Sequence, residues 1–144
     1  MREPLTLTLS INASSSVNPD DKKRSTPILV RVYELKSADT FNQTDFYSLH
    51  DKDKTLLAED LVTRDQFLLR PGESRTIARN ANDASTTLGV IAAYRDLPHS
   101  VWRATWPLPA TPTVAWYRRA QDLKLIIDLG ADAIRISDVQ SQNK

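Results

Sequence analysis

The amino-acid sequence predicts a mainly β protein, folded as a single β-sandwich domain over residues 1–144. Two observations lead to this fold class. Apolar and polar residues alternate from Leu5 to Asn12, as in a strand with one buried face. Further short apolar segments follow, separated by clusters of Asn, Asp, Pro and Gly at a spacing typical of sandwiches. A length of 144 residues, of which 40% are hydrophobic, leaves room for one domain with one core.

The first two strands are expected to differ in their surroundings. In the first, Leu5, Leu7, Leu9 and Ile11 alternate with polar residues, so that one face is apolar and the other faces water. The segment Pro27 to Lys36 (PILVRVYELK) is rich in β-branched residues and has apolar side chains on both faces. This pattern favours a central strand that is covered on both sides.

The connection between these strands, residues 13–26 (ASSSVNPDDKKRST), shows no apolar periodicity and is long for a loop inside a compact domain. Its charges nearly cancel, because an acidic pair precedes a basic triplet. Such a segment is either a solvated, flexible loop or a functional one. Its composition leaves both interpretations open.

A small helical insertion is expected at about residues 37–60. Ser37 and Asp45 are candidate N-caps of two short helical turns. From Leu56 to Leu69 the periodicity does not distinguish helix from strand. The sequence RPGE that follows predicts a turn, because proline presets the φ angle that the turn needs.

The remainder of the chain predicts five more short strands and a tail. The strand segments read SRTIAR, TLGVIAAYRD, SVWRATWPL, DLKLIIDLG and DAIRIS. Gly130 to Asp132 is expected to form the last hairpin turn. Residues 138–144 are expected to be a flexible tail.

Composition argues against several classes of function. A formal net charge of +1 is too small for the overall field to attract nucleic acid, so no nucleic-acid partner is expected. The absence of cysteine excludes disulfides and thiolate metal sites. Three glycines are too few for a phosphate-binding loop, and His50 and His99 belong to no metal-binding pair. No serine carries the flanking glycines of a nucleophile elbow, so neither enzyme activity nor a cofactor or metal is expected.

The acidic motifs do not indicate a site. Residues 51–55 (DKDKT) resemble the start of a calcium-binding loop, but Leu56 and Val62 occupy the positions that require glycine and glutamate. The adjacent carboxylates at residues 20–21 and 59–60 are interpreted as solvated charges, because neighbours on a strand point to opposite faces.

The three tryptophans leave two interpretations open. Trp102, Trp106 and Trp116, with arginines close in sequence, would suit an aromatic platform for carbohydrate or another ligand. Trp102 and Trp106, however, share one face of a strand, which favours a place in the sandwich core. A periplasmic β-sandwich that binds carbohydrate or a small ligand is therefore the alternative function.

Taken in order, several motifs resemble the TssJ/SciN family of type VI secretion lipoproteins. They are NPD at residues 18–20, STPILVRVYELKSADTF at residues 25–41, LLRPGES at residues 68–74 and LGVIAAYRDL at residues 88–97. Each motif is weak alone, but their order and spacing are fairly specific. The similarity extends from about Leu5 to Ser137.

This resemblance implies a transthyretin-like β-sandwich of two sheets with short helical additions. It also implies a structural role without catalysis, as a lipoprotein held on the periplasmic face of the outer membrane by its inner leaflet. The expected partner is the C-terminal periplasmic domain of the inner-membrane protein TssM. The acylated cysteine of the family would stand just upstream of Leu5, and the sequence does not contain it.

The resemblance also implies that the long loop at residues 13–26 contacts the partner. The residues predicted to form this partner-binding loop are Val17, Asn18, Pro19, Asp20, Asp21, Lys22, Lys23 and Arg24. Proline fixes φ, and the flanking Asn and Asp can bond to nearby backbone groups, so the loop is expected to be locally rigid. Its charges are expected to set the orientation of the partner more than the affinity.

Overall fold

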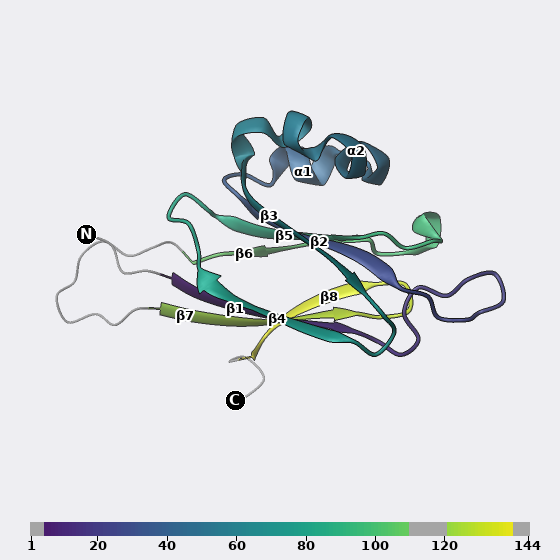
Figure 1. The fold of residues 1–144 in the computed structure, drawn as a ribbon. Coiled ribbons are helices and arrows are strands. Elements are labelled where there is room, and N and C mark those ends of the chain that lie inside the picture. Colours follow the sequence, from purple (N-terminus) through teal and green to yellow (C-terminus); the bar gives the residue numbers. More distant parts are fainter. Residues whose placement is uncertain (1–4, 110–120, 140–144) are drawn as a thin grey trace.

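The computed structural model describes residues 5–109 and 121–139, which form two four-stranded sheets packed face to face (Figure 1). The strand order is β4-β1-β7-β8 in one sheet, here the β1 sheet, and β3-β2-β5-β6 in the other, the β2 sheet. The predicted mainly β sandwich is confirmed. The elements are β1 (Leu5–Ala13), β2 (Ile28–Leu35), α1 (Asp39–Gln43), α2 (Phe46–Leu57), the 3₁₀ turn η1 (Ala58–Asp60), β3 (Leu61–Leu69), β4 (Ser74–Asn80), β5 (Thr87–Ala92), the 3₁₀ turn η2 (Leu97–His99), β6 (Arg103–Pro107), β7 (Gln121–Leu129) and β8 (Ile134–Asp138).

β1 is the strand that its alternating residues predicted. It lies inside its sheet, antiparallel to β4 and parallel to β7. Leu5, Leu7, Leu9 and Ile11 are buried in the core between the two sheets, while the residues between them are half-buried. The apolar face of the strand therefore builds the core.

β2 is covered on both faces, as its composition predicted. Ile28, Val30 and Val32 belong to the core between the sheets. Tyr33 and Leu35 belong to a second apolar cluster, which they form with residues of α1 and α2. The helices lie on the outer face of the β2 sheet, so this sheet is the middle of three layers (Figure 1).

The segment whose type the sequence left open contains the end of a helix, a 3₁₀ turn and a strand. α2 ends at Leu57, and β3 begins at Leu61. Between them, Ala58 has a φ of 47°. A residue with a Cβ rarely adopts this left-handed conformation within a helix, so the α-helix stops there.

The two predicted N-caps differ in the structure. The carboxylate of Asp45 accepts a hydrogen bond of 3.1 Å from the backbone N–H of Ser48 and caps α2 as predicted. The hydroxyl of Ser37 accepts a hydrogen bond of 3.2 Å from the N–H of Asp39, but the N-cap position of α1 is Ala38. Ser37 thus stabilises the start of this helix from one residue earlier.

The C-terminal segments follow the prediction with one correction. β7 and β8 are antiparallel, and Gly130 to Asp132 lie in the turn between them. β8 extends to Asp138, so the predicted start of the flexible tail at residue 138 is wrong. Residues 140–144 of the predicted tail lie outside the described residues. Within residues 5–109 and 121–139, every helix is too short or too polar to cross a membrane.

The two ends of the sandwich carry different connections. The loop between β1 and β2, the η2 segment between β5 and β6, and the β7–β8 turn project from the same end (Figure 1). β1 begins at the opposite end, where the N–H of Ala81 bonds to the carbonyl of Leu5. Because β1 is nine residues long, the two ends are about 30 Å apart.

Candidate functional site

The loop between β1 and β2 is held at its base by Asn18, whose side chain is buried. The Nδ2 group donates a hydrogen bond of 3.0 Å to the carbonyl of Pro27, and Oδ1 accepts one of 2.8 Å from the N–H of Arg95. The backbone N–H of Asn18 donates to the carbonyl of Ala131 at 3.0 Å. Its carbonyl accepts from the hydroxyl of Thr26 at 2.5 Å. Asn18 therefore joins the loop to the η2 segment and to the β7–β8 turn.

The tip of the loop is ordered by Asp20. Oδ1 of Asp20 accepts hydrogen bonds of 2.9 Å from the backbone N–H groups of Lys22 and Arg24, and Oδ2 forms an ion pair of 3.1 Å with Arg24 Nε. The hydrogen bond from the Arg24 backbone is the main reason why the pKa of Asp20 is lowered. Lys23 has a φ of 62°, which closes the turn. These contacts support the local rigidity expected for this loop, which stays a prediction.

The predicted binding residues divide into a buried base and an exposed tip. Val17 is fully buried in the core between the sheets, and Asn18 is 3% exposed. Pro19 and Asp20 are half-buried. The four charged residues from Asp21 to Arg24 are exposed. Direct contact with a partner therefore remains a prediction for the tip, whereas Val17 and Asn18 support the tip from below.

A cleft of about 830 Å³ lies beside the loop. One wall is formed by the loop from Asn18 to Lys23, and the opposite wall by the η2 segment and the β7–β8 turn. Tyr94 is buried beneath it, and its hydroxyl donates a hydrogen bond of 2.9 Å to the carbonyl of Gly130. Burial raises the pKa of Tyr94, so the group stays neutral and does not act as a base at physiological pH.

The cleft has unpaired charges of both signs on its two walls. The loop contributes Asp21 and Lys23, and the opposite wall contributes Arg95 and Asp132. Within residues 5–109 and 121–139, these four side chains form no ion pair or hydrogen bond, and all four residues are exposed. Exposed charges of this kind orient a charged partner and speed its association.

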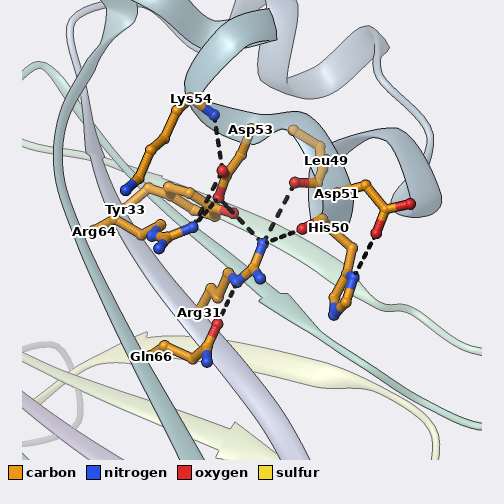
Figure 2. A network of polar contacts seen from close by, with 9 residues as sticks. All are labelled: Arg31, Tyr33, Leu49, His50, Asp51, Asp53, Lys54, Arg64 and Gln66. Carbon is orange, nitrogen blue, oxygen red and sulfur yellow. Dashed lines mark hydrogen bonds and ion pairs between the residues drawn. The ribbon is translucent and has the colours of Figure 1, made fainter.

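A second group of polar side chains fastens α2 to the β2 sheet (Figure 2). The carboxylate of Asp53 accepts hydrogen bonds from Tyr33 at 2.8 Å, from Arg31 at 3.2 Å and from Arg64 at 2.9 and 3.1 Å. The guanidinium of Arg31 also donates to Gln66 at 2.7 Å. Asp53 is 3% exposed and Arg31 is 8% exposed, so the ion pair is buried.

This network is structural rather than catalytic. Burial by itself raises the pKa of Asp53, but the hydrogen bonds from Arg64 and Tyr33 and the charges of Arg64 and Arg31 outweigh it, so the pKa is lowered. Burial raises the pKa of Tyr33. The carboxylate thus stays charged and the phenol stays neutral, and neither is poised to exchange a proton near neutral pH. In the sequence, Asp53 lay in a charged stretch that gave no sign of burial.

A third polar group connects the two sheets near the start of β1. Glu34 of β2 is 1% exposed, and its carboxylate pairs with Arg79 of β4 at 2.9 Å. The same carboxylate accepts hydrogen bonds from the N–H of Asn82 at 3.0 Å and from the hydroxyl of Ser85 at 2.9 Å. Arg79 also pairs closely with Asp65 of β3. The edge strands of the two sheets are tied together there.

The histidines are exposed or half-buried and lie apart. His50 pairs with Asp51 at 3.1 Å, and His99 pairs with Asp96 at 3.0 Å. The described part of the chain contains no group of three His, Cys, Asp or Glu residues that could hold a metal ion.

The two described tryptophans pack against apolar residues. Trp106 is half-buried against the core between the sheets. Trp102 contacts both apolar clusters, with its ring at 5.4 Å from that of Phe46 and with the guanidinium of Arg103 at 4.4 Å from its centre. These contacts support the core interpretation rather than an aromatic platform. Trp116, the third tryptophan considered for such a platform, lies outside the described residues.

Comparison with known families identifies this architecture. Residues 5–132 match the family T6SS-SciN, described as type VI secretion lipoprotein, VasD, EvfM, TssJ. No curated protein sequence matches the chain.

Solved structures agree with the family match. The chain is 36% identical to the type VI secretion lipoprotein TssJ1 from Pseudomonas aeruginosa, with a TM-score of 0.84 over 94% of this chain and 96% of that chain. It is 31% identical to Lip from Serratia marcescens, described as a membrane-bound component of the type VI secretion system, with a TM-score of 0.82 over 92% and 96%. A chain from a structure described as the TssM C-terminal domain from EAEC shares the fold, at 21% identity and a TM-score of 0.70 over 93% and 98%.

The buried polar groups around Asp53 and Glu34 hold the helices and the two sheets together. The family match extends over nearly the whole described sandwich. The transthyretin-like fold and the structural role that the resemblance implied are confirmed, in preference to a carbohydrate-binding module. The chain therefore belongs to the TssJ/SciN family of type VI secretion lipoproteins, a family of structural, non-enzymatic proteins.

Proposed function

We propose that this lipoprotein is anchored in the inner leaflet of the outer membrane and docks the C-terminal periplasmic domain of TssM through the tip of its β1–β2 loop, Pro19 to Arg24. The observation that carries the proposal is the state of this tip. Its backbone is ordered by hydrogen bonds to Asp20, while its charged side chains from Asp21 to Arg24 are exposed. An ordered, exposed and charged tip is suited to binding another protein.

The order of the tip lowers the entropic cost of binding. A flexible loop of this length would lose backbone freedom when a partner fixed it. Here the N–H of Asp20 bonds to the carbonyl of Arg24 at 2.8 Å, and the N–H of Lys23 bonds back to the carbonyl of Asp20 at 2.9 Å. The free loop therefore has a defined shape before it meets a partner.

The position of the tip fits a protein anchored by a lipid at its N-terminal side. In the family the acylated cysteine precedes β1, and β1 begins at the end of the sandwich opposite the loop (Figure 1). The loop would thus be presented about 30 Å from the anchored end. Each buried lipid CH₂ contributes about 0.8 kcal/mol, so several acyl chains hold the protein durably without contact between the sandwich and the membrane.

The choice of partner comes from the family resemblance, and a chain with this fold also occurs in a structure described as the TssM C-terminal domain. The test is a variant that removes three of the four exposed charges of the tip but keeps its shape, Asp21→Ser, Lys22→Ser and Lys23→Asn. Asparagine tolerates the left-handed conformation at position 23, and Asp20 remains to order the backbone. The matched control is Asp83→Ser, which removes an exposed charge from the β4–β5 connection.

Affinity for the purified TssM periplasmic domain is measured by calorimetry. We expect the tip variant to bind at least about tenfold more weakly, because several oriented charges are lost, and the control to bind like the wild type. The far-UV spectrum of both should be unchanged. Full affinity of the tip variant would assign docking to another surface.

A further inference from the structure

The three connections at the loop end of the sandwich are joined through one residue. Asn18 contacts the start of β2 through Pro27, the η2 segment through Arg95 and the β7–β8 turn through Ala131. These contacts link residues that are 9, 77 and 113 positions away from Asn18 in the sequence. The two walls of the cleft are therefore connected at the base of the loop.

We propose that Asn18 is a positioning residue for docking: it fixes the charged tip of the loop relative to the opposite wall of the cleft, so that both walls meet the partner as one surface. This inference rests on the proposed function. It names the polypeptide partner of that function as the occupant of the cleft, because six of the eleven residues that line the cleft are charged, unlike the mainly apolar pockets that suit small ligands.

The conformation and burial of Asn18 make this role specific. Its φ is 52°, in the left-handed region that asparagine and glycine tolerate better than other residues. It is 3% exposed, so its own side chain does not reach a partner. Both side-chain polar atoms and both backbone polar groups have hydrogen-bond partners within the protein.

The charges that Asn18 holds in register lie on both sides of the cleft. Asp21 and Lys23 are on the loop, within five residues of Asn18. Arg95 lies on the opposite wall, and its own backbone N–H donates to Asn18 Oδ1 at 2.8 Å. Without this bond the loop and the η2 segment would be connected only indirectly, because the Asn18 N–H bonds to Ala131 of the β7–β8 turn and the Val101 N–H bonds to Asp132 of the same turn. The partner would then have to order them, and affinity would fall.

The test compares two substitutions of Asn18 in the otherwise intact protein. Asn18→Gly keeps the left-handed backbone and removes both side-chain hydrogen bonds. Asn18→Asp keeps the acceptor for the Arg95 N–H, but it replaces the donor to Pro27 with an oxygen and adds a negative charge at a buried position. The readouts are affinity for the purified TssM periplasmic domain and hydrogen exchange of the Arg95 amide, which reports on the bond that couples the walls.

We expect Asn18→Gly to bind about tenfold more weakly and its Arg95 amide to exchange faster, with unchanged protection of the β1 and β7 amides. Asn18→Asp should keep a protected Arg95 amide and bind more tightly than Asn18→Gly. Wild-type affinity of Asn18→Gly would overturn the proposal.

Two controls separate positioning from general stability. Ile127→Val removes one methylene group from the buried face of β7 and destabilises the sandwich without removing a hydrogen bond of the loop. Asn82→Gly removes a turn-forming asparagine from the end of the sandwich opposite the loop. Its Oδ1 accepts a hydrogen bond of 2.8 Å from the N–H of Ala84. Both should bind like the wild type. If Ile127→Val loses as much affinity as Asn18→Gly, Asn18 acts only through stability.

The affinities of the tip variant and of Asn18→Gly, taken together, also separate this inference from the proposed function. If the tip variant described above binds weakly while Asn18→Gly binds normally, the loop docks the partner and the positioning role is wrong. If the tip variant itself keeps full affinity, the proposed docking site is wrong.

Discussion

The buried ion pair between Asp53 and Arg31 offers a stringent test of what holds the helices on the sheet. In Asp53→Asn the side chain keeps its shape but loses its negative charge. Arg31, whose side chain is 9% exposed, then carries a charge that no carboxylate balances. Breaking a buried pair from one side typically costs about 3–5 kcal/mol. Arg31 keeps its bonds to Gln66 and to the carbonyl of His50, so we expect about 3 kcal/mol.

The assay is denaturant unfolding at neutral pH, repeated toward acid. Because the pKa of Asp53 is lowered in the folded state, its stabilisation is present above the pKa of the unfolded state, about 3.9, and is lost as the pH falls through the folded value. Asp53→Asn should lack this acid-dependent part. The matched control is Asp51→Asn, because the Asp51 side chain is 72% exposed. The free energy of unfolding of this variant should differ from that of the wild type by less than about 0.5 kcal/mol. A loss below about 1 kcal/mol in Asp53→Asn would refute the reasoning.

Three further predictions concern packing and the loop. Gly89→Ala places a Cβ 2.9 Å from the ring of Phe41, so we expect unfolding stability to fall by about 1–3 kcal/mol, measured by denaturant titration; an unchanged midpoint would show that the ring moves freely. Trp106→Ala should lower the free energy of unfolding by about 2 kcal/mol, which is below the usual loss for a fully buried tryptophan because Trp106 is half-buried. A thermal melt without any shift would contradict its packing against the core. Asp20→Ala should speed amide exchange at Arg24 and weaken TssM binding, because the carboxylate no longer accepts from the Arg24 N–H. In the wild type the same loosening should appear as the pH falls below about 3.8, since the pKa of Asp20 is lowered. An unaltered exchange rate in the variant would count against Asp20 as the residue that orders the tip.

Local patterns predicted the strands well because the order of apolar and polar residues within a strand shows which of its faces are buried. The alternation in β1 requires one apolar face, and the two apolar faces of β2 require cover on both sides. The same reasoning failed between Leu56 and Leu69, where a helix, a 3₁₀ turn and a strand succeed one another within a few residues. A window long enough to show a period then contains more than one element.

The candidate site was predictable only in part. The long loop stood out because it lacked periodicity, and the sequence motifs suggested its family role. The sequence did not show that Asn18 bonds to Arg95 and Ala131, because those partners are 77 and 113 positions away. In the sequence, Asp53 belonged to a motif at residues 51–55 that resembled only the start of a calcium-binding loop, and its burial became apparent only when α2 was placed on the β2 sheet.

By itself, the sequence determined the strand content of this protein, the long loop and the family to which its motifs belong, because hydrophobic periodicity and short motifs are local properties of the chain. The tertiary structure alone decided the parallel pairing of β1 with β7, the burial of Asp53 and the union of three distant segments at Asn18. Those features depend on which remote groups meet when the two sheets pack. A buried polar group needs a partner, and folding brings that partner from a distant part of the chain.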